Sequence, residues 1–254
     1  MQSFLTVLIN PVAGREDDFN DWYTNVHIRD VMRFAGSIRV QRLIAAEIQV
    51  QTPSHKYFTI YDTFDPALLS LEHKQAMGTR RMVVTHAHDK TDVINGYYYP
   101  VAARTNQPTS LTPDNQSLVL EQINVPAARQ ADFEDWYATD RLPALLCRPS
   151  HVSGMLMRFD PAGQMFTFEP AFSHIAIWRV ENLASALPAW SEGPADGRMA
   201  ELNRRVAFFD VMGPYLTRDD VFNASEEQLE VEEAARRRAE QSTATTAELG
   251  VKWR

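Results

Sequence analysis

The sequence predicts an α+β protein made of two tandem βαββαβ, or ferredoxin-like, repeats. Two observations carry this prediction. The order strand, helix, strand, strand, helix, strand can be traced twice along the 254 residues. Residues 18–23 also recur as residues 132–137, with five identities in six positions that include the rare residues Trp and Tyr. Such self-similarity indicates an internal duplication.

The first repeat alternates apolar, β-branched segments with segments of helical periodicity. In residues 15–34, aromatic and aliphatic side chains recur every three or four positions, as in an amphipathic helix, and Gly36 ends it. Asp65 and Pro66 suit the N-cap and the first position of a second helix. The predicted elements are strand 4–9, helix 15–34, strands 37–50 and 56–64, helix 66–80 and strand 91–101.

The second repeat follows a segment whose Pro, Ser, Thr, Asn and Asp content is typical of a linker. Its predicted elements are strand 117–124, helix 128–147, strands 152–159 and 172–180, helix 182–206 broken around Gly193 and Pro194, and strand 207–216. The charged tail is predicted to be helical over 226–240 and disordered over 242–250. The expected divisions are 1–105, linker 106–115, 116–222 and tail 223–254.

A four-stranded sheet with both helices on one face must bury its other face. We therefore expect the two sheets to pack face to face as a barrel within one chain. Such a barrel leaves room for an apolar pocket between a sheet and its helices. The tail is expected to be a solvated or loosely docked helix. The alternative is an arm that grips a partner subunit and makes a homodimer.

Charge and composition exclude several classes of protein. The net charge of −8 and the pI of about 5.4 argue against nucleic acid and anionic membranes as partners. The single Cys147 allows no internal disulfide, which suits a reducing cytoplasm. The apolar run at the N-terminus is too short for a signal peptide, and no run approaches the ~20 apolar residues of a membrane helix. A cytoplasmic protein is expected.

Motifs for common cofactors are missing from the sequence. There is no Gly-x-Gly-x-x-Gly, P-loop or Gly-x-Ser-x-Gly motif and no cysteine-based zinc pattern. We therefore expect no nicotinamide, flavin or ATP site and no metal.

His27 and Asp30 form the most suggestive pair. Three positions apart on a helix, they share one face, with Trp22 and Tyr23 one turn earlier. A histidine beside a carboxylate and among aromatic rings can transfer protons near neutral pH. The alternative is a surface histidine that is paired incidentally. In the second repeat the aromatic pair is kept, but the equivalents of His27 and Asp30 are Arg141 and Ala144.

This segment resembles the signature of the dimeric α+β barrel superfamily, in particular EthD-like proteins. The similar residues are Asn10, Pro11, Gly14, residues 16–23, His27, Asp30, Val31 and Gly36. Arg29 departs from it, because many relatives have proline there. The resemblance implies a cofactor-free lyase, dehydratase or decarboxylase of aromatic or polyketide-like compounds. Related barrels include cofactor-free monooxygenases and isomerases, and some bind haem.

The resemblance thus implies a cofactor-independent lyase acting on an aromatic or otherwise apolar small molecule. His27 would transfer the proton and Asp30 would orient it. The expected pocket residues are Trp22, Tyr23, Tyr98, His174 and Arg141, the last recognising an anionic group. A cofactor-free monooxygenase or isomerase and a non-catalytic binding barrel are the alternatives.

The other histidines have less distinctive surroundings. His86 and His88 could belong to a metal motif, a polar loop or the rim of a pocket. His174 suits a satisfied core position as well as a ligand, and haem would need such an axial ligand. His55 and His73 are expected in a loop and on a helix surface.

Overall fold

The computed structural model describes residues 2–77, 79–106, 115–164, 171–191 and 197–248. Its first half runs β1 (Ser3–Pro11), α1 (Glu16–Trp22), the π-helical turn η1 (Tyr23–His27), α2 (Ile28–Arg33), β2 (Ser37–Ala45), β3 (Tyr57–Thr63), α3 (Pro66–Ala76) and β4 (His88–Thr105). This is the predicted βαββαβ order. Asp65 caps α3 as expected, because its carboxylate accepts a hydrogen bond from the backbone N–H of Leu68 at 2.9 Å.

The second half repeats the order. It runs β5 (Ser117–Asn124), η3 (Ala127–Arg129), α4 (Gln130–Trp136), the π-helical turn η4 (Tyr137–Arg141), α5 (Leu142–Leu146), β6 (His151–Phe159), β7 (His174–Val180), α6 (Leu183–Ala186), α7 (Pro188–Ser191), α8 (Gly197–Ala200) and β8 (Asn203–Val211). β9 (Leu216–Thr217), α9 (Arg218–Phe222) and α10 (Glu226–Glu248) then return to the first half.

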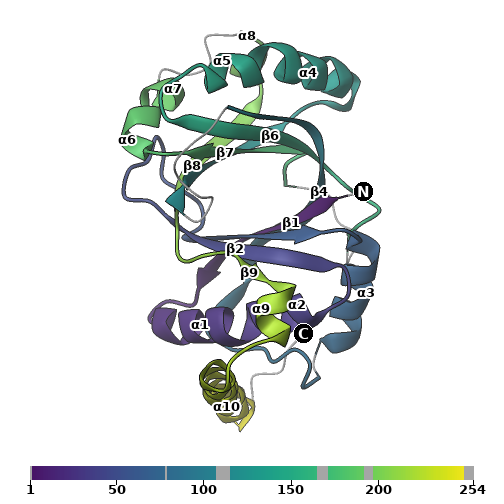
Figure 1. Cartoon of the computed structure of the whole chain (residues 1–254), viewed down its shortest axis with the longest axis vertical. Coiled ribbons are helices and arrows are strands. Elements are labelled where there is room, and N and C mark those ends of the chain that lie inside the picture. The colour runs from purple at the N-terminus through teal and green to yellow at the C-terminus, as the bar shows by residue number, and fades with distance from the viewer. Residues whose placement is uncertain (1, 78, 107–114, 165–170, 192–196, 249–254) are drawn as a thin grey trace.

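The strands close into one antiparallel barrel. The hydrogen-bonded order β3-β1-β4-β6-β7-β5-β8-β2 returns to β3 through the β2–β3 pairing, with β9 added beside β2. The two halves therefore pair at their edges, β4 with β6 and β2 with β8, as well as packing face to face. Figure 1 shows helices of the first half below the barrel and helices of the second half above it. The α+β barrel expected from the sequence is confirmed.

Some predicted boundaries differ because contacts between the halves decide them. β2 ends at Ala45 rather than at residue 50, where the chain turns to bind the second half: the backbone N–H of Ala46 donates to Phe208 O at 2.9 Å. The helix predicted over 182–206 stops early, because Asn203 already begins β8 and pairs with β5. The predicted break at Gly193 and Pro194, and residues 107–114 of the linker, lie outside the described residues.

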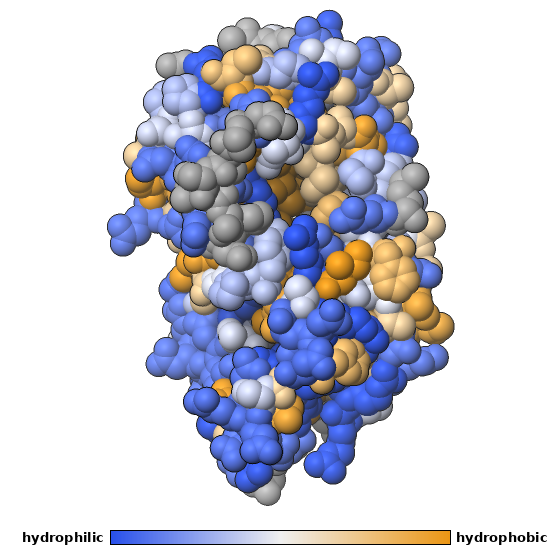
Figure 2. Space-filling model, viewed as in Figure 1, coloured by the Kyte–Doolittle hydropathy of each residue, from blue (hydrophilic) through white to orange (hydrophobic). Residues whose placement is uncertain are grey.

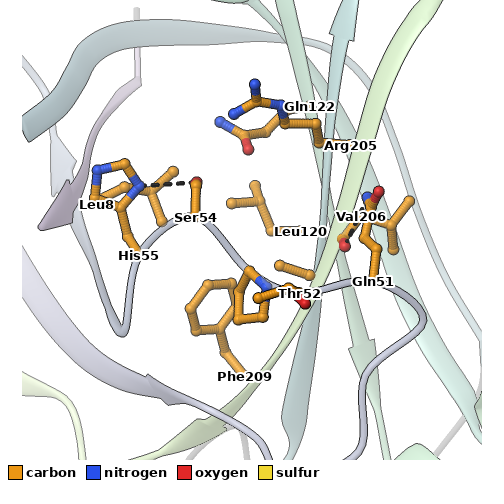
Figure 3. Close-up of a pocket in the computed structure, with 12 residues that line it drawn as sticks. Leu8, Gln51, Thr52, Ser54, His55, Leu120, Gln122, Arg205, Val206 and Phe209 are labelled. Carbon is orange, nitrogen blue, oxygen red and sulfur yellow. Dashed lines mark hydrogen bonds between the residues drawn. The ribbon is translucent and has the colours of Figure 1, made fainter. Parts of the chain in front are cut away.

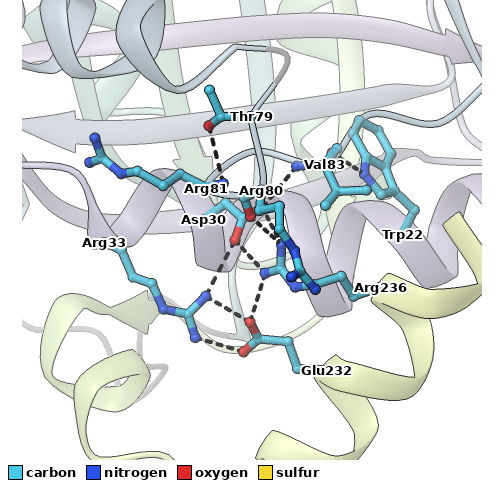
Figure 4. Close-up of polar contacts among 9 residues, drawn as sticks. All are labelled: Trp22, Asp30, Arg33, Thr79, Arg80, Arg81, Val83, Glu232 and Arg236. Carbon is cyan, nitrogen blue, oxygen red and sulfur yellow. Dashed lines mark hydrogen bonds and ion pairs between the residues drawn. The ribbon is translucent and has the colours of Figure 1, made fainter. Parts of the chain in front are cut away.

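The tail helix α10 is docked on its own chain. Ala235 and Ala239 are buried against the first half, and Figure 4 shows Arg236 and Glu232 reaching α2. Arg236 donates to the buried carboxylate of Asp30 at 2.5 Å, and Arg33 donates two bonds of 2.7 Å to Glu232. The helix continues to Glu248, through most of the segment expected to be disordered.

Figure 2 shows mainly hydrophilic residues over the end of the molecule that α10 forms. Leu229 and Val231 of α10 are about half exposed. Homodimerisation through the tail stays a prediction.

Replacing Arg236 by alanine is expected to destabilise the fold. Asp30 would lose its nearer charged donor and keep only Arg33 at 3.4 Å while staying buried, which costs about 1.5–3 kcal/mol. Urea unfolding measures the change. The matched control is Arg237→Ala, whose exposed pair with Glu233 is worth less than ~1 kcal/mol. Equal losses in the two variants would contradict the docking of the tail through Arg236.

Candidate functional site

The first helix is interrupted by the π-helical turn η1, which ends at His27. Such turns are rare and are frequent at functional sites. The second half has the same turn, ending at Arg141. The two π turns occupy equivalent places, so the special backbone belongs to the shared scaffold, and only the side chain at its end differs.

A cavity of about 510 Å³ lies between the sheet and the helices of the first half. Its volume falls within the usual range for small-molecule sites. β1 and β4 form one wall, and η1 and α3 form another. The lining residues are Leu5, Val7, Ile9, Trp22, Tyr23, His27, His73, Met77, Met82, Val84, His88, Lys90, Val93, Asn95, Tyr97 and Gln164, the last from the second half. Apolar side chains dominate this set.

Three histidines converge on this cavity. The ring of His27 lies 4.7 Å from that of Trp22, and the ring of His88 stacks parallel to Trp22 at 5.4 Å. His73 lies 6.4 Å from His27 between ring centroids. The indole N–H of Trp22 donates to the carbonyl of Val83 at 2.8 Å, which fixes the ring between its neighbours. Within the described ranges, no three His, Cys, Asp or Glu side chains are placed to hold a metal ion.

The imidazoles at the cavity are neutral at neutral pH. Burial, followed by the neighbouring His73, His88 and Arg42, lowers the pKa of His27 well below its usual value. Burial lowers the pKa of His73 and of His88 to about 4. Nδ1 of His27 is enclosed without a hydrogen-bond partner, so Nε2 is the ring nitrogen open to the cavity. His27 is therefore present as the free base, the form that accepts a proton, and the lowered pKa makes it a weaker base than a solvent-exposed imidazole.

His73 and His88 make stability depend on pH. Their folded pKa of about 4 lies below the unfolded value of 6.5, so between these values the unfolded chain binds more protons. Stability therefore falls as pH falls from 6.5 to 4, by about 1.4 kcal/mol per pH unit for each histidine. Urea unfolding across this range measures the slope. The double variant His73→Gln/His88→Gln should show a flatter profile, and an unchanged slope would contradict this assignment.

Asp30 does not orient His27, contrary to the sequence-based prediction. Its carboxylate is bound by Arg236 and Arg33 and by the backbone N–H of Val83 at 3.4 Å. Burial raises the pKa of Asp30 in spite of these partners. A spacing of three residues predicted that both side chains lie on one helix face. The π turn ends at His27, however, and Arg236 of the tail helix binds Asp30 instead.

Three further pocket predictions need correction. Tyr98 points between the two sheets, where its hydroxyl donates to Phe172 O at 3.1 Å, and Tyr97 lines the cavity instead. His174 is buried in the second half, 2.9 Å from Glu134. Arg141 is paired with Glu121 at 2.8 Å and is not available to a ligand of the first half. Trp22, Tyr23 and His27 do line the cavity, and their roles stay predictions.

His73 and His88 line the cavity together with His27. His73 was expected on a helix surface, but α3 turns this side chain toward Phe34 and His27. For His88 the pocket rim was one of three alternatives. The alternation within β4 could have grouped Val93, Asn95 and Tyr97 on one face, and these three do line the cavity.

The equivalent place in the second half is filled by charged side chains. The strand registers of the two halves show which positions are equivalent: Val7 corresponds to Glu121, and Val93 corresponds to Arg204. In the helix, His27 corresponds to Arg141. Glu121 is fully buried and is bound by Arg141, by Arg204 at 2.5 Å and by the hydroxyl of Tyr137 at 2.7 Å. The halves therefore share a fold, but an apolar cavity in one is replaced by an ion-pair network in the other.

No known family model matches the sequence, and a search of curated proteins finds no match either. Solved structures do share the fold. An anthrone oxidase-like protein is 11% identical with a TM-score of 0.63, over 88% of this chain and 96% of its own. A candidate monooxygenase from Fusobacterium nucleatum is 8% identical with a TM-score of 0.54, over 85% and 94%. A candidate chlorite dismutase is 9% identical with a TM-score of 0.52, over 87% and 98%.

These similarities establish the fold, an α+β barrel that the three structures share. They also contradict the lyase expected from the sequence. The similar proteins carry the names of an oxidase-like protein, a monooxygenase and a chlorite dismutase, which are oxidoreductases. The prediction of a lyase is therefore wrong, and the monooxygenase alternative agrees better with these names. Across the described residues, no helix is long and apolar enough to cross a membrane.

Proposed function

We propose that the protein is an oxidoreductase of the cofactor-free monooxygenase type, acting on an apolar, aromatic carbon acid. The observation that carries the proposal is a neutral His27 whose open nitrogen faces an apolar cavity of about 510 Å³. The name of the anthrone oxidase-like structure suggests the substrate class: a methylene group between aromatic rings that is acidified by a conjugated carbonyl.

The reaction balances without a bound cofactor. Nε2 of His27 removes one methylene proton, and the carbanion that remains shares its charge with the carbonyl oxygen. This electron-rich anion reduces O2 and forms a carbon–oxygen bond, giving a hydroperoxide once a proton is returned. Loss of the second methylene proton and of hydroxide yields the ketone, so that one CH2 and one O2 give one C=O and one H2O.

Residues around His27 suit the binding of such an anion. Asn95 lines the cavity, and its side chain has no hydrogen-bond partner among the described residues. Although Asn95 is exposed, we assign its amide as the donor to the carbonyl oxygen on which negative charge develops, where a hydrogen bond stabilises the anion. Apolar residues such as Leu5, Val7 and Val93 would hold the rings and exclude water.

Oxygen uptake tests the proposal. The full chain, treated with a chelator, is assayed with anthrone and its hydroxylated analogues against an enzyme-free rate. We expect one O2 consumed per ketone formed and no product under anaerobic conditions. Anaerobic turnover, or binding of these compounds without oxygen uptake above the enzyme-free rate, would overturn it and favour an isomerase or a binding barrel.

We also infer that the two halves arose by duplication. The equal element order, the five identities in residues 18–23 and 132–137 and the paired π turns support this inference. The likeness of the first half to EthD-like proteins and the divisions 1–105, 106–115, 116–222 and 223–254 belong to the same proposal.

A further inference from the structure

A second pocket, of about 270 Å³, lies at the barrel interior between the two sheets (Figure 3). It is separate from the cavity of His27, because the two share no lining residue. Leu8, Leu120 and Phe209 form an apolar floor that belongs to the core between the sheets. One side of the pocket, by contrast, is polar.

The polar side is formed by Gln122 and Arg205, which face each other directly across β5 and β8. Figure 3 shows their polar ends close together at one side of the pocket. Gln122 is only 5% exposed, and its amide has no hydrogen-bond partner among the described residues. Arg205 is exposed and forms no ion pair within the same residues, and its guanidinium lies 5.7 Å from the centre of the Phe172 ring.

Packing does not require this polar pair. The equivalent positions of the first half are Leu8 and Ile94, which face each other across β1 and β4 and are apolar. The amide of Gln122 is instead open to the pocket, where a ligand can accept its hydrogen bonds.

The opposite rim is held in place before any ligand arrives. Hydrogen bonds from residues 49 and 51 connect this rim to β8. The side-chain amide of Gln49 donates to Phe208 O and accepts from the backbone N–H of Phe208, and Gln51 donates to Val206 O at 3.0 Å. His55 is buried between Ser54 and Asp92, at 2.9 and 3.1 Å. A rim fixed in this way loses little entropy on binding.

We propose that this pocket binds a small molecule in which a carboxylate is attached to an apolar group. The planar carboxylate accepts hydrogen bonds from the guanidinium of Arg205 and the amide of Gln122, a geometry that favours arginine. The apolar group lies on Leu120 and Phe209. This site takes no part in the reaction proposed for His27.

Calorimetric titration of the full chain with benzoate and hexanoate tests the site, with benzamide and hexanol as neutral analogues. We expect the carboxylates to bind and the neutral analogues to bind more weakly. Arg205→Gln should weaken carboxylate binding at least about tenfold while leaving the neutral analogues unchanged. Gln122→Leu, which installs the first-half residue, should also weaken carboxylate binding and keep the fold.

Arg104→Gln is the matched control, because Arg104 is an exposed arginine of β4 outside the pocket. His27→Ala should leave carboxylate binding intact, which separates this proposal from the proposed oxygenation. No binding at millimolar concentration, equal binding of the neutral analogues, or equal effects of Arg205→Gln and Arg104→Gln would overturn it.

Discussion

Replacement of His27 by alanine is expected to lower kcat for oxygen uptake by about 100- to 10,000-fold, the usual contribution of a general base. Its neutral imidazole has an open nitrogen in the cavity and lies against Trp22 at the end of the π turn, and no carboxylate lines that cavity among the described residues. Substrate affinity should change little, because the apolar lining residues remain. Steady-state oxygen consumption gives kcat, and fluorescence titration under anaerobic conditions gives the Kd.

Two further variants make this result specific. His27→Gln keeps the size of the side chain but is a far weaker base, so it should lose activity like the alanine variant. Asp30→Asn removes the carboxylate that the sequence predicts to orient His27. This variant should retain kcat but unfold at a lower urea concentration, because Asp30 binds the tail helix. A large loss of kcat in Asp30→Asn with normal kcat in His27→Gln would reverse the two assignments.

Replacement of Glu121 by alanine is expected to destabilise the protein by about 3–5 kcal/mol, as when one member of a buried ion pair is removed. Burial alone would raise the pKa of Glu121, but Arg141 and Arg204 outweigh it, and the net pKa lies below its usual value. Without the carboxylate, both guanidinium groups would stay buried and uncompensated. Urea unfolding followed by circular dichroism measures the loss.

The first half supplies the control for this prediction. The triple variant Glu121→Val, Arg141→His and Arg204→Val installs the residues of the first half at all three positions. Replacing a whole buried network by apolar groups is often neutral or stabilising. The triple variant should therefore be more stable than Glu121→Ala. Equal instability of the two variants would mean that the attraction within the ion pairs exceeds the cost of desolvating their charges, and it would contradict this prediction.

The local pattern of the sequence was sufficient to predict the elements and their order. Hydrophobic periodicity identified the helix that carries Trp22 and His27, and Asp65 with Pro66 marked the start of α3. The recurrence of residues 18–23 predicted two similar halves, and the bare face of each sheet predicted a barrel. These features depend on neighbours along the chain, which a single sequence shows directly.

Only the tertiary structure decided which side chains that are distant in sequence contact one another. Alternation could not say which of Tyr97, Tyr98 and Tyr99 faces the cavity, because the parity of a strand is set by its partners. Asp30 shares a helix with His27 but is bound by Arg236, which lies 206 residues later. His73 and His88 join His27 only when α3 and β4 pack beside η1. The sequence by itself thus determined the scaffold and the position of His27, and packing decided its neighbours, because burial and pairing energies depend on contacts that the fold creates.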